Sequence, residues 1–336
     1  MSEPSPSRGS IYVTRRLPAS TEASLRRDYG ATLNADDAQR RDDELQGALA
    51  AHDILLCTLT DRLTRDVLAA GEGRCRLLAN FGAGTNHIDL RAAREFGMRV
   101  TNTPGVLTDD TADLTMLLIL AAARRAREGD AEIRHGTWEG WRPTHLLGTR
   151  VSGATLGIVG FGRIGQAVAR RAWAGFGMPV RYHSRHRVSA SAEAASHATF
   201  VPDLGELLRS CDVISLHCPA TPATHHLIAA PQLACMRAGA FLVNTARGDV
   251  VDEVALVHAL EAGTIAGAAL DVFEHEPRVP DALRTHPAVF ALPHLGSATV
   301  ASREAMGASA LRNIAAFLRG DPLPDAVDDH PAGRTG

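Results

Sequence analysis

The sequence predicts an α/β fold whose sheets are built from parallel strands, and three observations support this prediction. Short apolar runs alternate with amphipathic segments of about ten residues along most of the chain, which is the pattern of strands separated by helices. One apolar run passes through a glycine-rich turn directly into a helix-like segment. The 336 residues are enough for two domains of ordinary size, each with its own core.

The first strand–helix series occupies residues 11–105. Its apolar runs predict strands within residues 11–17, 53–59, 75–82 and 98–104, with a Leu- and Ala-rich helix that ends at Ala51. Pro104 and Gly105 close the series. Residues 108–127 are rich in Ala, Leu and Met and predict one long helix.

A second series begins at Thr155 and contains six strand-like runs. They lie within residues 155–161, 179–184, 212–218, 240–246, 267–273 and 290–296. Six such strands match the count of a doubly wound dinucleotide-binding sheet. One further helix is expected at about residues 302–318, and the pattern alone does not decide which domain it joins.

Composition and charge exclude several classes of protein. A net charge of −3 provides no basic field for nucleic acid, and the longest apolar stretch, residues 114–123, is too short to cross a bilayer. The five cysteines are scattered without CxxC spacing, so neither a disulfide framework nor a zinc site is indicated. The first residues lack the apolar core of a signal peptide. We therefore expect a cytoplasmic protein that binds neither nucleic acid nor membrane.

The glycine-rich turn predicts a dinucleotide site. Gly160, Gly162 and Gly165 form a GxGxxG motif between an apolar strand and a helix. The first glycine permits the tight turn, the second lets the backbone approach a pyrophosphate, and the third lets helix and strand pack closely. The exposed N–H groups and the helix dipole would attract the phosphates.

The residues after the next strand bear on which dinucleotide binds. About twenty residues beyond the turn, where a protein that binds NAD usually has an acid for the ribose, the chain has Ser184, Arg185 and Arg187. Arg185 would form charge-assisted hydrogen bonds with a ribose 2′-phosphate, assisted by Ser184 and Arg187. This favours NADP over NAD; the alternative is that these arginines are solvated surface residues.

Three later strands end in reactive side chains, at the edge where open α/β sheets bind ligands. Arg247 follows the first strand, Asp271 and Glu276 follow the second, and His294 follows the third. A base, an acid partner and a fixed cation near a nicotinamide indicate hydride transfer at a carbonyl beside a carboxylate. Glu274 is the nearest competitor of Glu276 for the acid role, since the two lie two residues apart.

The adjacent His225 and His226 do not indicate a metal site. Neighbouring histidines are poorly placed to share one ion, and no carboxylate cluster accompanies them. We expect both to be structural or near the cofactor, and we expect no bound metal.

Taken together, these segments resemble the D-2-hydroxyacid dehydrogenase family, and more narrowly its glyoxylate and hydroxypyruvate reductases, also called D-glycerate dehydrogenases. The resemblance covers nearly the whole chain, from ANFGAGTNHID through GWRPTHLLGT and HCPATPATHHLI to PHLGSAT. It implies a Rossmann dinucleotide-binding domain inserted into a flavodoxin-like, parallel-sheet substrate domain, with the active site in the cleft between them. The implied limits are residues 1–107 and 295–336 for the substrate domain and 108–294 for the cofactor domain.

The resemblance also implies roles for single residues. Arg247 would bind the substrate carboxylate and 2-oxo group, His294 would donate a proton to the developing alkoxide, and Glu276 would orient and stabilise the imidazole. Backbone N–H groups of Ala83 and Gly84 would also hold the carboxylate. The implied cofactor contacts are Gly160, Phe161, Gly162, Arg163, Ile164, Gly165, Ser184, Arg185, Arg187, Cys218, Pro219, Thr224, Thr245, Ala246, Asp271, His294 and Gly296. Of these, Cys218 is expected to pack beside the nicotinamide and not to act as a nucleophile.

The implied activity is the NADPH-preferring reduction of glyoxylate or hydroxypyruvate to a D-2-hydroxy acid, with NAD as a possible cofactor. One alternative is a 2-hydroxyacid dehydrogenase that uses NADH and a bulkier 2-oxo acid. In a different class, the same fold serves dinucleotide-binding corepressors, but the complete set of Arg, Glu and His favours an enzyme. The resemblance further implies a homodimer, with Trp138 and Trp141 in a segment that reaches toward the partner subunit.

Overall fold

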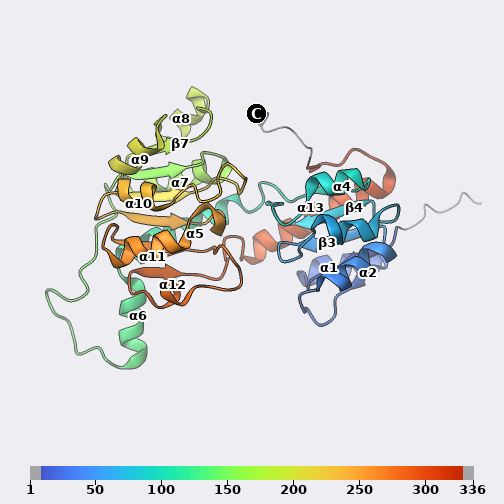
Figure 1. Cartoon of the computed structure of the whole chain (residues 1–336), viewed down its shortest axis with the longest axis horizontal. Helices are drawn as coiled ribbons and strands as arrows, with labels where there is room; N and C mark the ends of the chain where they lie inside the picture. Colours follow the sequence, from blue (N-terminus) through green and yellow to red (C-terminus); the bar gives the residue numbers. More distant parts are fainter. Residues whose placement is uncertain (1–8, 328–336) are drawn as a thin grey trace, which may run out of the picture. The chain divides into compact units, whose positions relative to one another are not determined.

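The computed structural model describes residues 9–327, which form two compact units (Figure 1). The first unit comprises the described residues up to Leu107 and from Thr299 onward, and the second runs from Thr108 to Ala298. The predicted limit of the second unit is His294, and the predicted outer limits at residues 1 and 336 lie outside the described residues. Each unit contains one parallel sheet with helices on its faces, so the predicted fold class is confirmed.

The first unit contains a five-stranded sheet with the order β2-β1-β3-β4-β5. The strands are β1 (Ile11–Val13), β2 (Thr32–Leu33), β3 (Ile54–Thr58), β4 (Leu77–Phe81) and β5 (Arg99–Thr101). Helices α1 (Ala19–Tyr29) and α13 (Val300–Arg319) cover one face, and α2 (Asp42–Ala51), α3 (Arg65–Leu68), the short 3₁₀ turn η1 (Ala69–Gly71) and α4 (Leu90–Glu95) lie on the other. Consecutive residues of β3 therefore enter two different cores, which is why this strand is an unbroken apolar run in the sequence.

The final helix, which the sequence pattern could not place, packs on the first sheet. Met306, Ala310 and Ile314 of α13 share a core with residues of β1, β3 and β4. The helix begins after Thr299, whose side chain caps the N–H of Ser302, and it ends at a glycine with positive φ.

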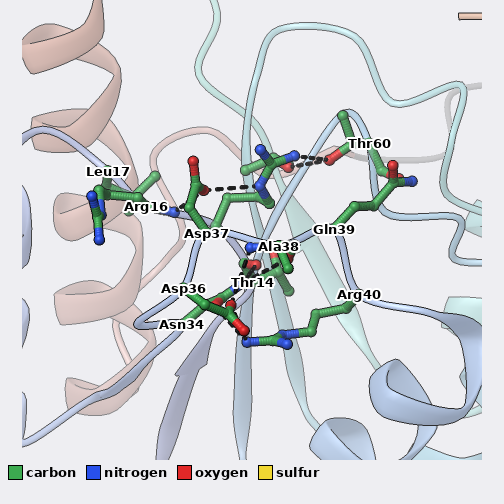
Figure 2. Close-up of polar contacts among 12 residues, drawn as sticks. Thr14, Arg16, Leu17, Asn34, Asp36, Asp37, Ala38, Gln39, Arg40 and Thr60 are labelled. Atoms are coloured by element: carbon green, nitrogen blue, oxygen red, sulfur yellow. Dashed lines mark hydrogen bonds and ion pairs between the residues drawn. The ribbon is translucent and has the colours of Figure 1, made fainter. Parts of the chain in front are cut away.

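Hydrogen bonds between polar side chains connect the loops that follow β1, β2 and β3 (Figure 2). Arg15 donates to the carboxylate of Asp37 at 3.0 Å and to the hydroxyl of Thr60 at 3.1 Å. The Gln39 amide donates to the carbonyl oxygen of Thr60 at 2.9 Å. Because Arg15 reaches both neighbouring loops, it fixes the carboxyl edge of this sheet.

The second unit contains a seven-stranded parallel sheet with the order β12-β11-β10-β9-β6-β7-β8. Its strands are β6 (Leu156–Val159), β7 (Val180–His183), β8 (Ala198–Phe200), β9 (Val213–Leu216), β10 (Phe241–Asn244), β11 (Gly267–Leu270) and β12 (Val289–Ala291). All six predicted strands are present, and the short edge strand β8 is additional. The strand order reverses between β6 and β9, and doubly wound sheets bind ligands beyond the carboxyl ends of the strands at such a switch point.

Helices cover both faces of this second sheet (Figure 1). One core contains α5 (Thr108–Ala123) and α7 (Arg163–Phe176), and the other contains α9 (Leu204–Ser210), α10 (Ala230–Cys235), α11 (Glu253–Glu261) and α12 (Asp281–Thr285). The remaining elements are α8 (Ala190–Ser196) and the 3₁₀ turn η2 (Gly248–Val250). Within residues 9–327, no helix is both long and apolar enough to cross a bilayer.

The prediction of one helix over residues 108–127 is wrong. Helix α5 ends at Ala123, and α6 (Ala126–His135) begins after Arg125, whose φ of 54° is left-handed. The side chain of Arg125 then binds Glu128 in the first turn of α6 at 2.6 Å. Because Ala, Leu and Arg all favour helix, composition could not reveal this break. Helix α6 projects from the body of the second unit (Figure 1).

Candidate active site

The glycine turn between β6 and α7 requires glycine at two positions for steric reasons. Gly160 has a φ of 91°, and a Cβ there would lie 2.5 Å from the backbone nitrogen of Cys218. A Cβ on Gly165 would lie 2.5 Å from the carbonyl oxygen of Gly160. Any larger side chain would therefore separate the turn from its neighbours.

Gly162 is constrained in a different way. It is the exposed N-cap of α7, and a Cβ there would meet no described heavy atom within 4 Å. Packing within the chain does not require glycine here, whereas close approach of a pyrophosphate to the backbone does. Arg163 is exposed and Ile164 partly exposed at the start of α7, while the Phe161 ring is buried against Tyr182. These residues fit a dinucleotide, with the helix N-terminus available for its phosphates.

The residues after β7 have different surroundings. Arg185 is exposed, and no described residue forms an ion pair or hydrogen bond with its guanidinium. Ser184 is partly exposed, and its hydroxyl donates to the carbonyl oxygen of His186 at 2.6 Å. Arg185 is thus the member of this group whose charge no described side chain balances.

Arg187 is already engaged by an acid. Two of its nitrogens each lie 2.8 Å from an oxygen of Glu193, and the hydroxyl of Tyr182 donates to the same carboxylate at 2.7 Å. The Arg187 and Tyr182 hydrogen bonds lower the pKa of Glu193 to about 2. To bind a phosphate, Arg187 has to share or leave this carboxylate.

Five of the other predicted cofactor residues, Cys218, Pro219, Thr224, Thr245 and Ala246, lie in the loops that follow β9 and β10. Cys218 is buried, and burial raises the pKa of its thiol to about 11, so it is not a thiolate at neutral pH. The hydroxyl of Thr224 donates to the carbonyl oxygen of Pro219 at 2.6 Å, which closes the loop between them. Thr245 is buried and shares a 3.0 Å hydrogen bond with Thr115 of α5.

His294 and Glu276 form a hydrogen-bonded pair. Nδ1 of His294 lies 2.8 Å from Oε2 of Glu276, and Oε1 of Glu276 accepts the N–H of Phe273 at 3.0 Å. Burial raises the pKa of Glu276, but these two hydrogen bonds and the charges of His294 and Arg247 outweigh burial, so the net pKa lies below its ordinary value. The side chains of His294 and Glu276 are 26% and 29% exposed, so solvent reaches both.

The loop that carries His294 is held by the buried carboxylate of Asp271. Its two oxygens accept the N–H of Leu295 at 2.6 Å and the N–H of Gly296 at 2.8 Å. The Asp271 carbonyl also accepts the N–H of His294 at 2.9 Å. These bonds hold His294 at a φ of 56°, a conformation that few non-glycine residues adopt. Burial raises the pKa of Asp271, although the N–H donors and His294 oppose it.

Arg247 lies on the loop between β10 and η2. The Asn244 amide donates to the carbonyl oxygen of Arg247 at 2.8 Å, and the guanidinium donates to the carbonyl oxygen of Ala246 at 2.6 Å. Burial lowers the pKa of Arg247, while the charges of Glu276 and Asp249 raise it. An arginine remains a cation under such shifts, so Arg247 supplies a fixed positive charge.

Gly248 allows the Arg247 loop to approach the turn that carries Glu276. A Cβ on Gly248 would lie 1.9 Å from the carbonyl carbon of Phe273 and 2.2 Å from the nitrogen of Glu274. Both neighbours are backbone atoms, so a side chain could not be accommodated by a rotamer change. The two segments therefore pack backbone against backbone.

The two candidate acids pair with different histidines. Nε2 of His226 lies 2.9 Å from Oε1 of Glu274, so Glu274 is committed to His226 and only Glu276 meets His294. The ring of His225 stacks on His226 with centroids 4.0 Å apart. Over the described ranges, no group of three or more His, Cys, Asp or Glu side chains is arranged to hold a metal ion.

Comparison with known proteins identifies the family. Residues 116–296 match the family model described as D-isomer specific 2-hydroxyacid dehydrogenase, NAD binding domain. The chain is 42% identical over 322 residues to a glyoxylate reductase of Thermococcus litoralis, covering 95% of this chain and 96% of the relative. It is 39% identical over 321 residues to a glycerate dehydrogenase of Hyphomicrobium methylovorum, covering 96% and 99%. The chain belongs to the D-isomer specific 2-hydroxyacid dehydrogenase family.

The structure of this dehydrogenase also resembles solved structures of the family. One is an NADPH-dependent glyoxylate/hydroxypyruvate reductase from Sinorhizobium meliloti in complex with NADP and malonate, with a TM-score of 0.85 and 32% identity over 98% of this chain and 100% of the other. The predicted resemblance is confirmed, and the protein is an NAD(P)-dependent oxidoreductase. The segment matched as the NAD binding domain includes the glycine turn, Arg247, Glu276 and His294.

Ala83 and Gly84 lie in the first unit of the dehydrogenase, in the loop after β4. The Asn102 amide donates to the carbonyl oxygen of Ala83 at 2.7 Å, and the Asn80 amide donates to that of Gly84 at 2.9 Å. The N–H groups of Ala83 and Gly84 have no acceptor among residues 9–327. Their role as donors to a carboxylate stays a prediction.

Sequence reasoning missed three residues that support the site of the dehydrogenase. Asn244 and Gly248 flank the predicted Arg247, and the polar end of a buried strand was a usable signal for Asn244. Glu253 accepts the N–H of Glu274 at 2.9 Å. It gave no such signal, because acids at a helix start are ordinarily explained by capping and the helix dipole.

Proposed function

We propose that this dehydrogenase reduces small 2-oxo acids, glyoxylate and hydroxypyruvate, to D-2-hydroxy acids, with NADPH as the preferred reductant. The observation that carries the proposal is the 2.8 Å hydrogen bond between Nδ1 of His294 and Glu276, in the unit that also holds the glycine turn and Arg247. The names of the relatives, glyoxylate reductase and glycerate dehydrogenase, support the same substrate class.

The proposed mechanism assigns one task to each side chain. When bound, NADPH supplies a hydride, which brings two electrons and one hydrogen to C2 of the substrate. Arg247 binds the carboxylate and the 2-oxo oxygen through parallel N–H groups. His294 gives its Nε2 proton to the C2 oxygen, so the carbonyl becomes an alcohol and the imidazole becomes neutral. Glu276 stabilises the imidazolium before transfer, and the partial exposure of the pair lets solvent restore the proton.

The proposal is tested by initial rates of NADPH and NADH oxidation with glyoxylate, hydroxypyruvate and a series of bulkier 2-oxo acids. We expect the highest kcat/KM for the two small acids with NADPH. A preference for NADH and a bulkier acid would support the alternative dehydrogenase. Dinucleotide binding without turnover of any 2-oxo acid would refute the proposal and favour a corepressor-like role.

The NADPH preference is proposed to rest on Arg185. We expect Arg185→Asp to raise the KM for NADPH between about 10- and 100-fold, because a charge-assisted hydrogen bond contributes about 1.5–3 kcal/mol. The KM for NADH is expected to change little, since NADH has no 2′-phosphate. The control is Arg170→Asp, which makes the same charge change at an exposed position on α7. Equal effects of Arg185→Asp on both cofactors would remove Arg185 from the 2′-phosphate site.

The dehydrogenase is further proposed to form a homodimer through α6 and the segment that follows it. Ile133, Trp138, Trp141 and Leu147 are 62%, 52%, 83% and 65% exposed, and such a group of exposed apolar side chains is typical of an interface. Sedimentation equilibrium is expected to give twice the mass of one chain. A monomer across the concentration range would overturn this part of the proposal.

A further inference from the structure

The turn that carries Glu276 rests on a buried acid that takes no part in the proposed chemistry. Glu253 is the first residue of α11 and is only 6% exposed. Its Oε1 accepts the N–H of Glu274 at 2.9 Å, across 21 residues of sequence. Glu274 directly follows Phe273, whose own N–H binds the Glu276 carboxylate. One short segment therefore links the buried acid to the acid that orients His294.

Capping of helix α11 does not explain this acid. Asp252 already caps the helix, since its side chain accepts the N–H of Ala255 at 3.0 Å. Burial raises the pKa of Glu253, the Glu274 N–H lowers it, and the nearby carboxylates of Glu274 and Glu276 raise it again. A buried carboxylate beside two other acids lowers the stability of the fold, so stability gives no reason for an acid at this position.

Backbone packing places the same turn against the loop of Arg247. Gly248 leaves no space for a Cβ beside the Phe273–Glu274 peptide, so that peptide cannot move toward η2. The hydrogen bond from Glu274 to Glu253 acts on the same peptide nitrogen. Steric contact and a directed hydrogen bond together define where the turn sits, and hence where the Glu276 carboxylate lies.

We propose that Glu253 is a positioning residue: by accepting the Glu274 N–H, it fixes the turn that holds Glu276 at hydrogen-bonding distance from His294. This inference rests on the proposed function only for its kinetic consequence. Removal of the acceptor leaves a buried N–H unpaired and lets the turn relax, so Glu276 loses its alignment with the imidazole.

The kinetic test compares Glu253→Ala with Glu253→Gln. Alanine removes the acceptor, whereas glutamine keeps a carbonyl oxygen at the same reach and loses only the charge. We expect Glu253→Ala to lower kcat for 2-oxo acid reduction between about 10- and 100-fold, the cost of a small misplacement in an active site. The KM for NADPH is expected to stay unchanged, and Glu253→Gln is expected to restore most of kcat.

A matched control separates positioning from stability. Asp252→Ala removes the cap of the same helix without touching the Glu274 N–H, so it is expected to lower the Tm while kcat is kept. Wild-type kcat in folded Glu253→Ala would overturn the inference. So would a glutamine variant as slow as the alanine variant, because an acceptor is then not what matters.

A second readout does not depend on activity. In protein with ¹⁵N-labelled histidine, the His294 imidazole signals are assigned from their loss in His294→Ala. We expect the Nδ1 signal to be that of a carboxylate-bonded ring in wild type and Glu253→Gln, and that of a solvated ring in Glu253→Ala. Identical Nδ1 signals in all three proteins would refute the inference, whether or not the protein reduces a 2-oxo acid. A lack of 2-oxo acid reduction would refute the proposed function alone.

Discussion

Replacement of His294 by alanine is expected to lower kcat for 2-oxo acid reduction by about 10²- to 10⁴-fold, the range that a positioned general acid contributes. Without the imidazole, the oxygen at C2 has to take its proton from water as negative charge develops. The glycine turn and Arg185, which are proposed to hold the pyrophosphate and the 2′-phosphate, are unchanged in this variant, so the Kd for NADPH is expected to stay within about threefold of wild type. Steady-state rates and a fluorescence titration with NADPH measure the two quantities separately.

The second histidine–glutamate pair provides the control for this variant. Nε2 of His226 lies 2.9 Å from Glu274, a distance close to the 2.8 Å between Nδ1 of His294 and Glu276. His226→Ala removes a histidine–glutamate hydrogen bond of similar length outside the proposed catalytic set, and we expect kcat within about threefold of wild type. Comparable losses in both variants would show that a general effect on the fold, and not proton donation by His294, limits the rate.

Replacement of Arg247 is expected to have the other largest effect. Arg247→Ala removes two charge-assisted hydrogen bonds to the substrate, each of about 1.5–3 kcal/mol, so kcat/KM for the 2-oxo acid falls by about 10²- to 10⁴-fold. Arg247→Lys keeps the charge but replaces a planar pair of donors with one rotatable ammonium, so it recovers only part of this loss. Initial rates over a range of substrate concentrations give the ratio directly.

A surface arginine serves as the control for Arg247. Arg237 binds the carboxylate of Asp212 at 2.6 Å in the same unit, and an exposed ion pair of this kind contributes about 0–1 kcal/mol. Arg237→Ala is therefore expected to leave kcat/KM nearly unchanged. Full activity of Arg247→Lys would contradict bidentate binding and leave only a requirement for positive charge.

The central strands were predictable because both of their faces are buried. Strands such as β3 and β10 are apolar up to their last residue and could be recognised without their partners. The edge strands β2 and β8 have two and three residues and expose part of their surface, so they carry no such signal. The break at Arg125 depends on a local backbone conformation that good helix formers conceal.

The nearness of the residues in the proposed site was predictable for a different reason. Parallel strands bring their carboxyl ends to one edge of the sheet, so residues that follow β10, β11 and β12 lie in the same region regardless of their distance in sequence. The pairing of Glu276 with His294, and of Glu274 with His226, depends on the direction in which each side chain leaves one short turn. Spacing along the chain does not specify that direction, so spacing alone could not decide which of the two acids pairs with His294.

The contact at Gly248 limits the routes by which the substrate range of this enzyme can change. A Cβ there would lie 1.9 Å from the Phe273 carbonyl carbon, so residues on either side of the contact cannot be remodelled independently. A change to the Arg247 loop that admits a longer acid would also displace Glu276, the partner of the proposed proton donor. Libraries aimed at new substrates should therefore leave residues 247–248 and 273–276 fixed and vary other segments, because most double changes within these two segments will be inactive.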